Sequence, residues 1–388
     1  MSAPRLKLLV GSWHMLKQVM AFGNPTAGGF ETMDEALRAI AVLNKELEVS
    51  HGITIAVSGH LFHEIIVPDG LTDLTFNTGW NKTRGIVFQT WMDGIKAGYY
   101  PQIGRIIPPG FGFPGSDNGA FINPNSAVQK FAHDMMVYSF QCSEYILSHP
   151  KFGDGNVIYW TGPDGIRWQR LVDGDDVFLG HDLNPELEEW KLIVNGVGDA
   201  VKAAREAGYT RTTLLIEGKP GGDPCYLDVF TDTVLEIKGI KAINEAVGAR
   251  VAEWQGEFCH SRGGGQMFVD AMQQAINGGV FGGRIHLNSG GLGATSFSDL
   301  LSVTGGTPIS CFQQYVDNDF LPGEGVDEWV DDQIATIELG AKWSAENGLP
   351  FEVEFDARFS RYPDTIGKLK KSAEWTIDQF NKAAADLS

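Results

Sequence analysis

Four residues of types that bind divalent metals stand at the ends of short apolar runs in the second half of the chain. They are Glu217, Glu257, His286 and Asp356. If these runs are parallel strands of a closed barrel, side chains at their carboxyl ends converge on one mouth. Carboxylates gathered there would repel one another unless a cation neutralised them. Oxygen-rich ligation with some imidazole suits Mg²⁺, Mn²⁺ or Co²⁺ better than a thiolate-preferring metal, so the pattern predicts a divalent-metal site.

Each of these residues also has a purely structural interpretation. A single glutamate at a strand end is commonly a solvated loop residue, and a lone histidine after an apolar run is commonly hydrogen-bonded within a core. Glu253 lies on the same apolar run as Glu257, which leaves two candidates on that strand. The metal interpretation rests on the coincidence of four such residues on four consecutive predicted strands.

An Asp-x-Asp sequence, Asp317-Asn318-Asp319, precedes the last predicted strand. Such a sequence is common and says little by itself. It would lie in the loop after the seventh strand, and His260 would stand nearby. We therefore consider Asp317, Asp319 and His260 as ligands of a second cation.

Apolar runs of strand length alternate with stretches of helical period, as in a mostly parallel α/β protein. The predicted strands are Leu6–Trp13, Ile53–Ser58, Gly104–Ile107, Asn156–Trp160, Thr212–Glu217, Arg250–Glu257, Gly283–Asn288 and Phe351–Asp356. The predicted helices are Met33–Leu47, Ser126–Ser148, Pro185–Ala207, Thr231–Ala246, Met267–Gly278 and Val326–Asn347. Eight alternating strands favour a (β/α)₈ TIM barrel.

Two stretches, Leu61–Tyr100 and Thr161–Asp182, fit neither pattern and are interpreted as elaborations of βα loops. A short helix follows the last strand. The sequence shows no internal repeat, low-complexity tract or linker-like segment, so residues 1–388 are predicted to form a single domain.

Composition excludes some classes of function. A net charge of −19 argues against nucleic-acid binding, which requires clustered Lys and Arg. Four cysteines without a CxxC pair are typical of a reducing compartment. The apolar part of Met1–Val10 is too short for a signal peptide, and no apolar run reaches the length of a membrane span. A cytoplasmic location without membrane partners is expected.

The motifs around these residues resemble those of the xylose isomerase-like superfamily. Glu217-x-Lys219-Pro resembles the Glu-Pro-Lys-Pro of xylose isomerases, Glu257-x-x-His260 their Glu-x-x-His, and Phe355-Asp356 their last ligand. Asp317-Asn318-Asp319 resembles their Asp-x-Asp. Gly282-Gly283-x-x-His286 is more similar to rhamnose isomerases, and Ile158-Tyr159-Trp160 to the tryptophan-bearing fourth strand of the sugar pocket.

The resemblance covers roughly Asn156 to Arg358 and is not complete. A long stretch, Ser289–Tyr315, separates His286 from the Asp-x-Asp. Without an insertion there, Ser296 and Ser298 would replace the two aspartates and the second cation would be lost. Arg358 stands where many xylose isomerases have lysine. Because one short helix is expected after Asp356, the long C-terminal arm of xylose isomerases is not expected.

The resemblance implies one or two divalent cations (Mn²⁺, Mg²⁺ or Co²⁺) per chain. The first would be held by Glu217, Glu257, His286 and Asp356, and the second by Glu257, His260, Asp317 and Asp319. The second would act as a Lewis acid on a sugar carbonyl. It also implies proton transfer assisted by Asp319 and stabilisation of charge on the carbonyl oxygen by Lys219.

Further residues are candidates for contact with the sugar. His60, at the end of the second strand, is the candidate base for ring opening, and His63 is nearly as good. Trp13 and Trp160 are candidate apolar walls, and Arg358 is a further substrate-binding candidate.

The function implied is aldose–ketose isomerisation of a small sugar by metal-assisted hydride shift, in a homo-oligomer (dimer or tetramer). Two alternatives remain. One is a single-metal epimerase or lyase that works through an enediolate, and the other is a non-catalytic sugar-binding subunit.

Overall fold

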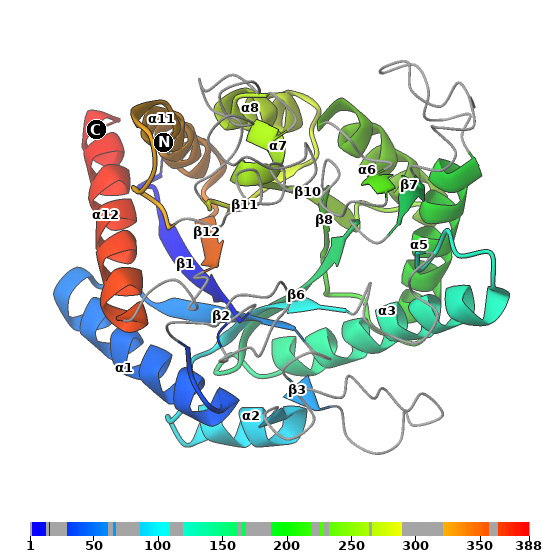
Figure 1. Cartoon of the computed structure of the whole chain (residues 1–388), viewed down its shortest axis with the longest axis horizontal. Helices are drawn as coiled ribbons and strands as arrows, with labels where there is room; N and C mark the ends of the chain where they lie inside the picture. Colours follow the sequence, from blue (N-terminus) through cyan, green and yellow to red (C-terminus); the bar gives the residue numbers. More distant parts are fainter. Residues whose placement is uncertain are drawn as a thin grey trace, which may run out of the picture.

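Eight parallel strands close into a barrel in the computed structural model, and helices surround it (Figure 1). The order around the barrel is β1-β12-β11-β10-β8-β6-β5-β2, so neighbours in sequence are neighbours in space, as in a (β/α)₈ TIM barrel. The structure describes residues 2–12, 15, 29–60, 65–66, 86–108, 119–161, 164–167, 188–218, 226–228, 233–263, 266–288, 321–356 and 364–387.

All eight predicted strands are present. The barrel strands are β1 (Leu6–Gly11), β2 (Ile55–His60), β5 (Ile103–Ile107), β6 (Gly153–Trp160), β8 (Leu214–Glu217), β10 (Ala252–Glu257), β11 (Phe281–His286) and β12 (Phe351–Asp356). Two small pairs lie outside the barrel, β3 (Ile65–Ile66) with β4 (Ile86–Val87) and β7 (Gly165–Arg167) with β9 (Tyr226–Asp228). β3, β4 and β7 fall in the predicted loop elaborations, whereas β9 follows β8.

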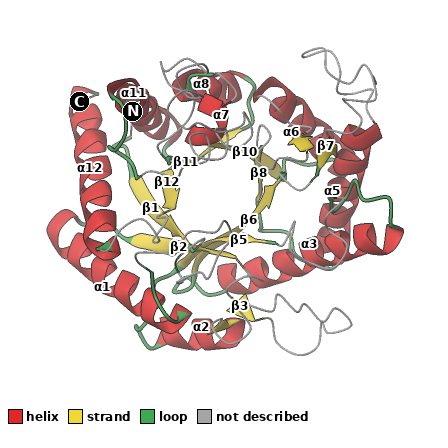
Figure 2. Ribbon diagram, viewed as in Figure 1, coloured by secondary structure: helices red, strands yellow, loops and turns green. Residues whose placement is uncertain are grey.

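Helices lie around the barrel (Figure 2), and they include the six that the sequence predicts. The described helices are α1 (Met33–His51), α2 (Phe88–Lys96), α3 (Ser126–Leu147), α5 (Glu188–Glu206), α6 (Thr233–Val247), α7 (Phe258–Gly263), α8 (Phe268–Asn277), α11 (Asp327–Asn347) and α12 (Thr365–Asp386). The C-terminal helix α12 is 22 residues long and packs on α11 and α1. None of the helices in these ranges is long and apolar enough to cross a bilayer.

Local signals explain several helix ends. Thr32 and Glu35 form a capping box at the start of α1, and Gly52 ends it in the left-handed conformation at φ 69°. The start of α8 uses a residue of another helix instead. Asp332 of α11 accepts hydrogen bonds from the backbone N–H groups of Phe268 (2.8 Å) and Val269 (3.0 Å). A carboxylate from α11 therefore caps α8 and joins the two helices.

The two faces of the strands have different chemistry. On β12, Phe351, Val353 and Phe355 pack in the apolar core between strands and helices. The alternate residues Glu352, Glu354 and Asp356 are also buried, and the alternation directs them into the barrel lumen. This lumen is therefore polar where barrels of this kind usually carry branched apolar side chains.

A buried arginine confirms that the carboxylates of β12 point into the barrel lumen. Arg105 of β5 is fully buried and forms an ion pair and hydrogen bond with Glu354 of β12. Strands β1 and β2 separate these two strands in the barrel order, so the contact must cross the lumen. A second carboxylate of β12, that of Glu352, also lies near arginines. Its Oε2 is 3.6 Å from Arg105 Nη2 and 3.3 Å from Arg284 Nε.

Candidate metal centre

The four strand-end residues meet at the carboxyl mouth of the barrel. Glu217, Glu257, His286 and Asp356 are the last residues of β8, β10, β11 and β12, and all four are buried. Glu257 lies directly beside His286 in the register of β10 and β11. The sequence prediction of convergence agrees with this geometry.

His286 is the centre of this group. Its Nδ1 lies 3.7 Å from Glu217 Oε2 and 3.8 Å from Glu257 Oε2, and its Nε2 lies 3.6 Å from Asp356 Oδ2. Within the part of the chain that the structure describes, neither ring nitrogen has a hydrogen-bond partner. Leaving both nitrogens of a buried imidazole unsatisfied costs free energy, so this histidine requires an explanation.

A cation fits the gap between these ligands. Two ligand atoms that are each about 2.1 Å from one cation lie roughly 3.0–3.4 Å apart in octahedral or tetrahedral geometry. The separations around His286 exceed this by a few tenths of an ångström and are too long for hydrogen bonds. One ligand atom each of Glu217, Glu257 and His286 lie within 4.8 Å of one another.

The two ring nitrogens face different partners. A cation held by Nδ1 would take Glu217 and Glu257 as its nearest carboxylates, while Asp356 lies across the ring at Nε2. Metal-binding histidines commonly donate their other N–H to a carboxylate, which fixes the ring. Asp356 therefore has two possible roles, as a ligand after a small rotation or as the carboxylate that orients His286.

The charge of the site also attracts a cation. Burial by itself lowers the pKa of His286, but the charges of Glu257 and Asp356 outweigh burial and raise this pKa well above its ordinary value. This shift favours a proton on the imidazole in the metal-free protein. A divalent cation would replace that proton and neutralise more of the negative charge.

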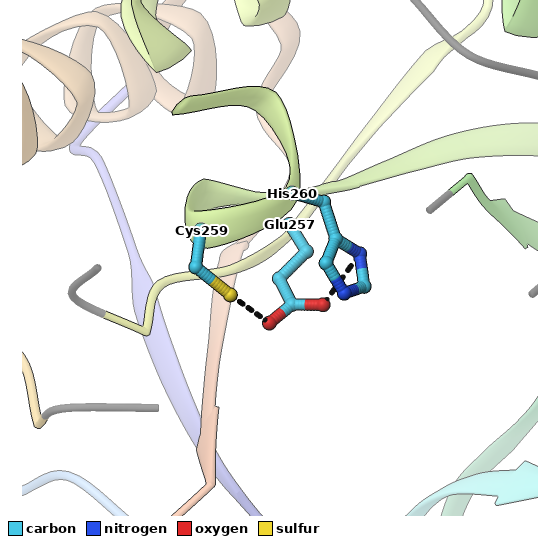
Figure 3. Close-up of side chains that lie close together, drawn as sticks. All are labelled: Glu257, Cys259 and His260. Atoms are coloured by element: carbon cyan, nitrogen blue, oxygen red, sulfur yellow. Dashed lines mark hydrogen bonds and ion pairs between the residues drawn. The ribbon is translucent and has the colours of Figure 1, made fainter. Parts of the chain in front are cut away.

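A second cluster shares Glu257. The short helix α7 starts directly after β10 and brings Cys259 and His260 to the same carboxylate (Figure 3). The thiol of Cys259 donates to Glu257 Oε1 at 2.6 Å, and His260 Nδ1 lies 2.6 Å from Oε2 and 3.0 Å from the carbonyl oxygen of Gly218. Glu257 and His260, which the resemblance predicts to share a cation, therefore lie in direct contact.

Polar residues below the mouth hold these side chains in place. The amide nitrogen of Gln255 donates to Glu217 Oε2 at 2.7 Å and to Glu354 Oε2 at 3.2 Å. Glu354 is in turn bound by Arg105. A continuous chain of buried polar contacts thus runs from Glu217 down the lumen to the guanidinium on the far side of the barrel.

The ambiguity between Glu253 and Glu257 is settled by their positions. Glu253 lies near the opposite end of β10, where its carboxylate pairs with Arg284 Nη1 at 2.8 Å and with Arg250 Nη2 at 3.2 Å. It is separated from the mouth by the layer of Gln255. Glu257 is the residue of this strand that belongs to the candidate metal centre.

The other predicted site residues divide into two groups. Trp160 ends β6 and lies beside Glu217 in the register, at the barrel mouth. His60 ends β2, but the description of this residue is limited to its backbone. The remaining candidates lie outside the described residues: Trp13, His63, Lys219, Asp317, Asp319 and Arg358.

Sequence reasoning missed the polar residues that contact the candidate ligands. Glu352, Glu354 and Asp356 alternate along one strand, which was a signal that three carboxylates face the lumen. No pattern connected them to Arg105, which is 249 residues away from Glu354. The spacing of the four cysteines gives no reason to place Cys259 in the site, although it is adjacent to His260.

Gly11, the last residue of β1, leaves the space that the Asp356 carboxylate fills. The two residues are register partners, and a Cβ at position 11 would lie 1.4 Å from Asp356 Oδ1. We expect Gly11→Ala to fold but to displace this carboxylate, because a side-chain end moves more easily than backbone. Metal affinity, measured by calorimetric titration, should fall by about 10–100-fold, whether Asp356 binds the cation or orients His286.

Gly198→Ala is the matched control for this substitution. Gly198 lies on helix α5, and a Cβ there would stand 3.6 Å from the Cβ of Ala246, an ordinary van der Waals contact. This variant should bind metal like the parent. Parental affinity in Gly11→Ala would show that the position of Asp356 does not matter for the cation.

Comparison with known proteins identifies the fold. No family model matches the sequence, and no curated protein sequence matches it. Solved structures do match. L-ribulose 3-epimerase aligns over 99% of this chain and 97% of its own, with a TM-score of 0.54 at 11% identity. The D-allulose 3-epimerase of Methylomonas sp. aligns over 98% and 100%, with a TM-score of 0.53 at 10% identity.

A third match, the IOLI protein solved with a zinc atom, covers 97% of this chain and 99% of its own, with a TM-score of 0.51 at 12% identity. The barrel shares its (β/α)₈ fold with these three proteins. The TIM barrel predicted from the sequence is therefore confirmed. Identities this low establish the fold alone.

Proposed function

We propose that this protein is a divalent-metal-dependent sugar isomerase that interconverts an aldose and a ketose. The observation that carries the proposal is the buried His286, whose Nδ1 faces Glu217 and Glu257 at distances that suit a shared cation while its Nε2 faces Asp356. Two proteins of the same fold are named as sugar epimerases and a third was solved with zinc, which supports a metal-dependent enzyme acting on sugars.

In the proposed reaction, Glu217, Glu257 and His286 would hold the cation, and Asp356 would complete or orient the set. The bound cation supplies Lewis acidity toward the oxygens of the sugar. Gln255 holds Glu217 Oε2 by a hydrogen bond, which preorganises this carboxylate before the cation and the sugar arrive. Trp160 is proposed as an apolar wall of the pocket, since it lies beside Glu217 at the mouth.

The remaining roles come from the motif resemblance. Lys219 is proposed to stabilise negative charge on the carbonyl oxygen, and Asp319 to assist movement of the hydroxyl proton. His60, or else His63, is proposed as the base that opens the sugar ring. Asp317, with Asp319, Glu257 and His260, would hold a second cation. A homo-oligomer is proposed on the same resemblance.

The test is a reaction carried out in D₂O with a panel of aldoses and ketoses and Mn²⁺-loaded protein. We expect aldose–ketose pairs as products, with little solvent deuterium at the carbon that receives the hydrogen, because a hydride shift does not exchange with water. Chelation should remove the activity. A Glu217→Gln preparation, purified identically, controls for contaminating isomerases.

Two other results would replace the proposal. Products that are epimers, with full deuterium at the carbon that changes configuration, would identify an epimerase that transfers a proton. Sugar binding without turnover of any member of the panel would instead support a sugar-binding subunit.

A further inference from the structure

The cluster at the start of α7 contains a cysteine in addition to the residues predicted to bind metal. Glu257 ends β10, and Cys259 and His260 lie in the first turn of the helix that follows it. In Figure 3 the sulfur of Cys259 and the ring of His260 approach the Glu257 carboxylate from its two sides. All three side chains are buried, and Cys259 has no exposed surface.

Short polar contacts join the three side chains of this cluster. The Cys259 thiol donates to Glu257 Oε1, and His260 Nδ1 contacts Oε2, both at 2.6 Å. The sulfur, one carboxylate oxygen and one imidazole nitrogen all lie within 4.8 Å of one another. Each ligand of a shared cation would stand about 2.0–2.3 Å from it, so small rotations of these side chains would enclose one.

A second observation at the same carboxylate also indicates a cation. The exposed fraction of His286 is 6%, and its Nδ1 lies 3.8 Å from Glu257 Oε2. Within the described residues that nitrogen has no hydrogen-bond partner. Glu257 is thus flanked by a sulfur and an imidazole on the α7 side and by an unsatisfied imidazole on the β11 side.

The helix that carries Cys259 is held in place from its other end. Arg262, in the last turn of α7, forms ion pairs with Glu328 and, at 3.4 Å, with Asp332 of α11. Asp332 also caps α8, so α7 is tied to two neighbouring helices. Ligands on a fixed element bind a metal with less loss of conformational freedom than ligands on a loop.

We propose that Cys259 is a metal ligand, and that Glu257, Cys259 and His260 form a thiolate-containing site for Zn²⁺ or Co²⁺. The proposal rests on the proposed function in one respect, since it shares Glu257 with the candidate metal centre. The thiol loses its proton to solvent as the metal–sulfur bond forms. Thiolate and imidazole favour zinc and cobalt over magnesium and manganese, which prefer oxygen.

The two sites around Glu257 therefore differ in chemistry. The site at His286 offers carboxylate oxygens and one imidazole, and suits a hard cation. The site at Cys259 adds a sulfur and suits a softer one. The protein would then hold two different metals when both are supplied, with Glu257 bridging them.

A cobalt titration distinguishes a site that contains a thiolate from a site of oxygen and nitrogen ligands. A Co²⁺–thiolate bond absorbs in the near ultraviolet, whereas Co²⁺ bound by oxygen and nitrogen shows weak visible bands alone. Metal-free full-length protein would be titrated with Co²⁺ in an absorption spectrometer. We expect the near-ultraviolet band in the parent and its loss in Cys259→Ser, which keeps a hydroxyl donor near Glu257. Zinc affinity should fall by about 10–100-fold or more in this variant, while Mn²⁺ affinity stays parental.

Cys142→Ser is the matched control, because Cys142 is also a buried free thiol but lies on α3. It should keep the near-ultraviolet band. Visible cobalt bands in the parent without the near-ultraviolet band would overturn the thiolate site and leave the proposed function standing. Absence of any cobalt binding would refute both. A band that persists in Cys259→Ser would assign the thiolate to another cysteine and overturn the proposal.

Discussion

Arg105→Met is expected to destabilise the metal-free protein by about 3–5 kcal/mol, the cost of leaving buried carboxylates without their counter-charge. Arg105 is fully buried and pairs with Glu354, while Glu352 Oε2 stands 3.6 Å from its guanidinium. Methionine fills similar space but carries no charge. Denaturant unfolding of parent and variant after chelation measures the difference.

A second substitution tests whether the cost comes from the unpaired charge. In Arg105→Met/Glu354→Gln the carboxylate closest to position 105 is neutral, so the double variant should recover a large part of the loss. Recovery in such a double-mutant cycle reports the coupling between the two residues. A double variant less stable than Arg105→Met would show that packing, rather than charge, dominates at this position.

The exposed pair of Arg38 and Asp34 provides the control. These residues are four apart on α1, their Arg38 Nε–Asp34 Oδ2 distance is 2.9 Å, and both side chains are about half exposed. Exposed pairs contribute up to about 1 kcal/mol. Arg38→Met should therefore cost far less than Arg105→Met. Equal costs would contradict the view that Arg105 is a buried counter-ion.

The barrel was predictable because its signals are local. Each strand is a short apolar run between helical stretches, and parallel strands joined by helices have few arrangements. Convergence of Glu217, Glu257, His286 and Asp356 followed from that topology, since strand ends meet at one mouth whatever the details of packing. This convergence was thus accessible without any knowledge of side-chain contacts.

Helix α2 was not predicted, and the reason is its composition. Its nine residues include Gly94 and Thr90, which weaken the helical signal. Tertiary contacts compensate, since Trp91 and Met92 are fully buried in the core. Gly94 is also required for packing, because a Cβ there would lie 1.9 Å from the ring of Tyr100. A residue that looks like a helix breaker in the sequence therefore serves close packing in the structure.

The lumen network was not predictable for a different reason. Whether Arg105 meets Glu354 depends on closure of the barrel, which brings β5 opposite β12 across the lumen. Sequence spacing carries no information about such a contact.

The position of Cys259 was predictable only in part. Its neighbour His260 was recognised, but the direction of a side chain in the first turn after a strand depends on where the helix begins.

Glu257→Gln should have the largest effect on metal binding, because this carboxylate contacts both His260 and, at 3.8 Å, His286. Glutamine keeps the shape of the side chain but removes its charge and one acceptor oxygen. Affinity should fall by about 100-fold or more at the candidate metal centre, beyond the 10–100-fold typical of losing a partner of a metal ligand. Turnover should fall with it.

Thermal or denaturant stability provides the readout without requiring a known substrate. At a metal concentration about 100 times its dissociation constant, the parent should gain about 2.7 kcal/mol of stability. A variant that binds about 100-fold more weakly should gain about 0.4 kcal/mol at the same concentration. Metal-induced stabilisation should therefore nearly disappear in Glu257→Gln while the metal-free protein still unfolds cooperatively.

Glu253→Gln is the matched control, since it makes the same chemical change on the same strand. Glu253 pairs with Arg284 and Arg250 below the layer of Gln255, away from the ligands. Its substitution should change the stability of the metal-free protein but leave the gain on adding metal intact. If instead Glu253→Gln lost the metal-induced gain and Glu257→Gln retained it, the cation would lie deep in the lumen. The strand-end carboxylates would then need another explanation, since their mutual repulsion at the mouth would remain unneutralised.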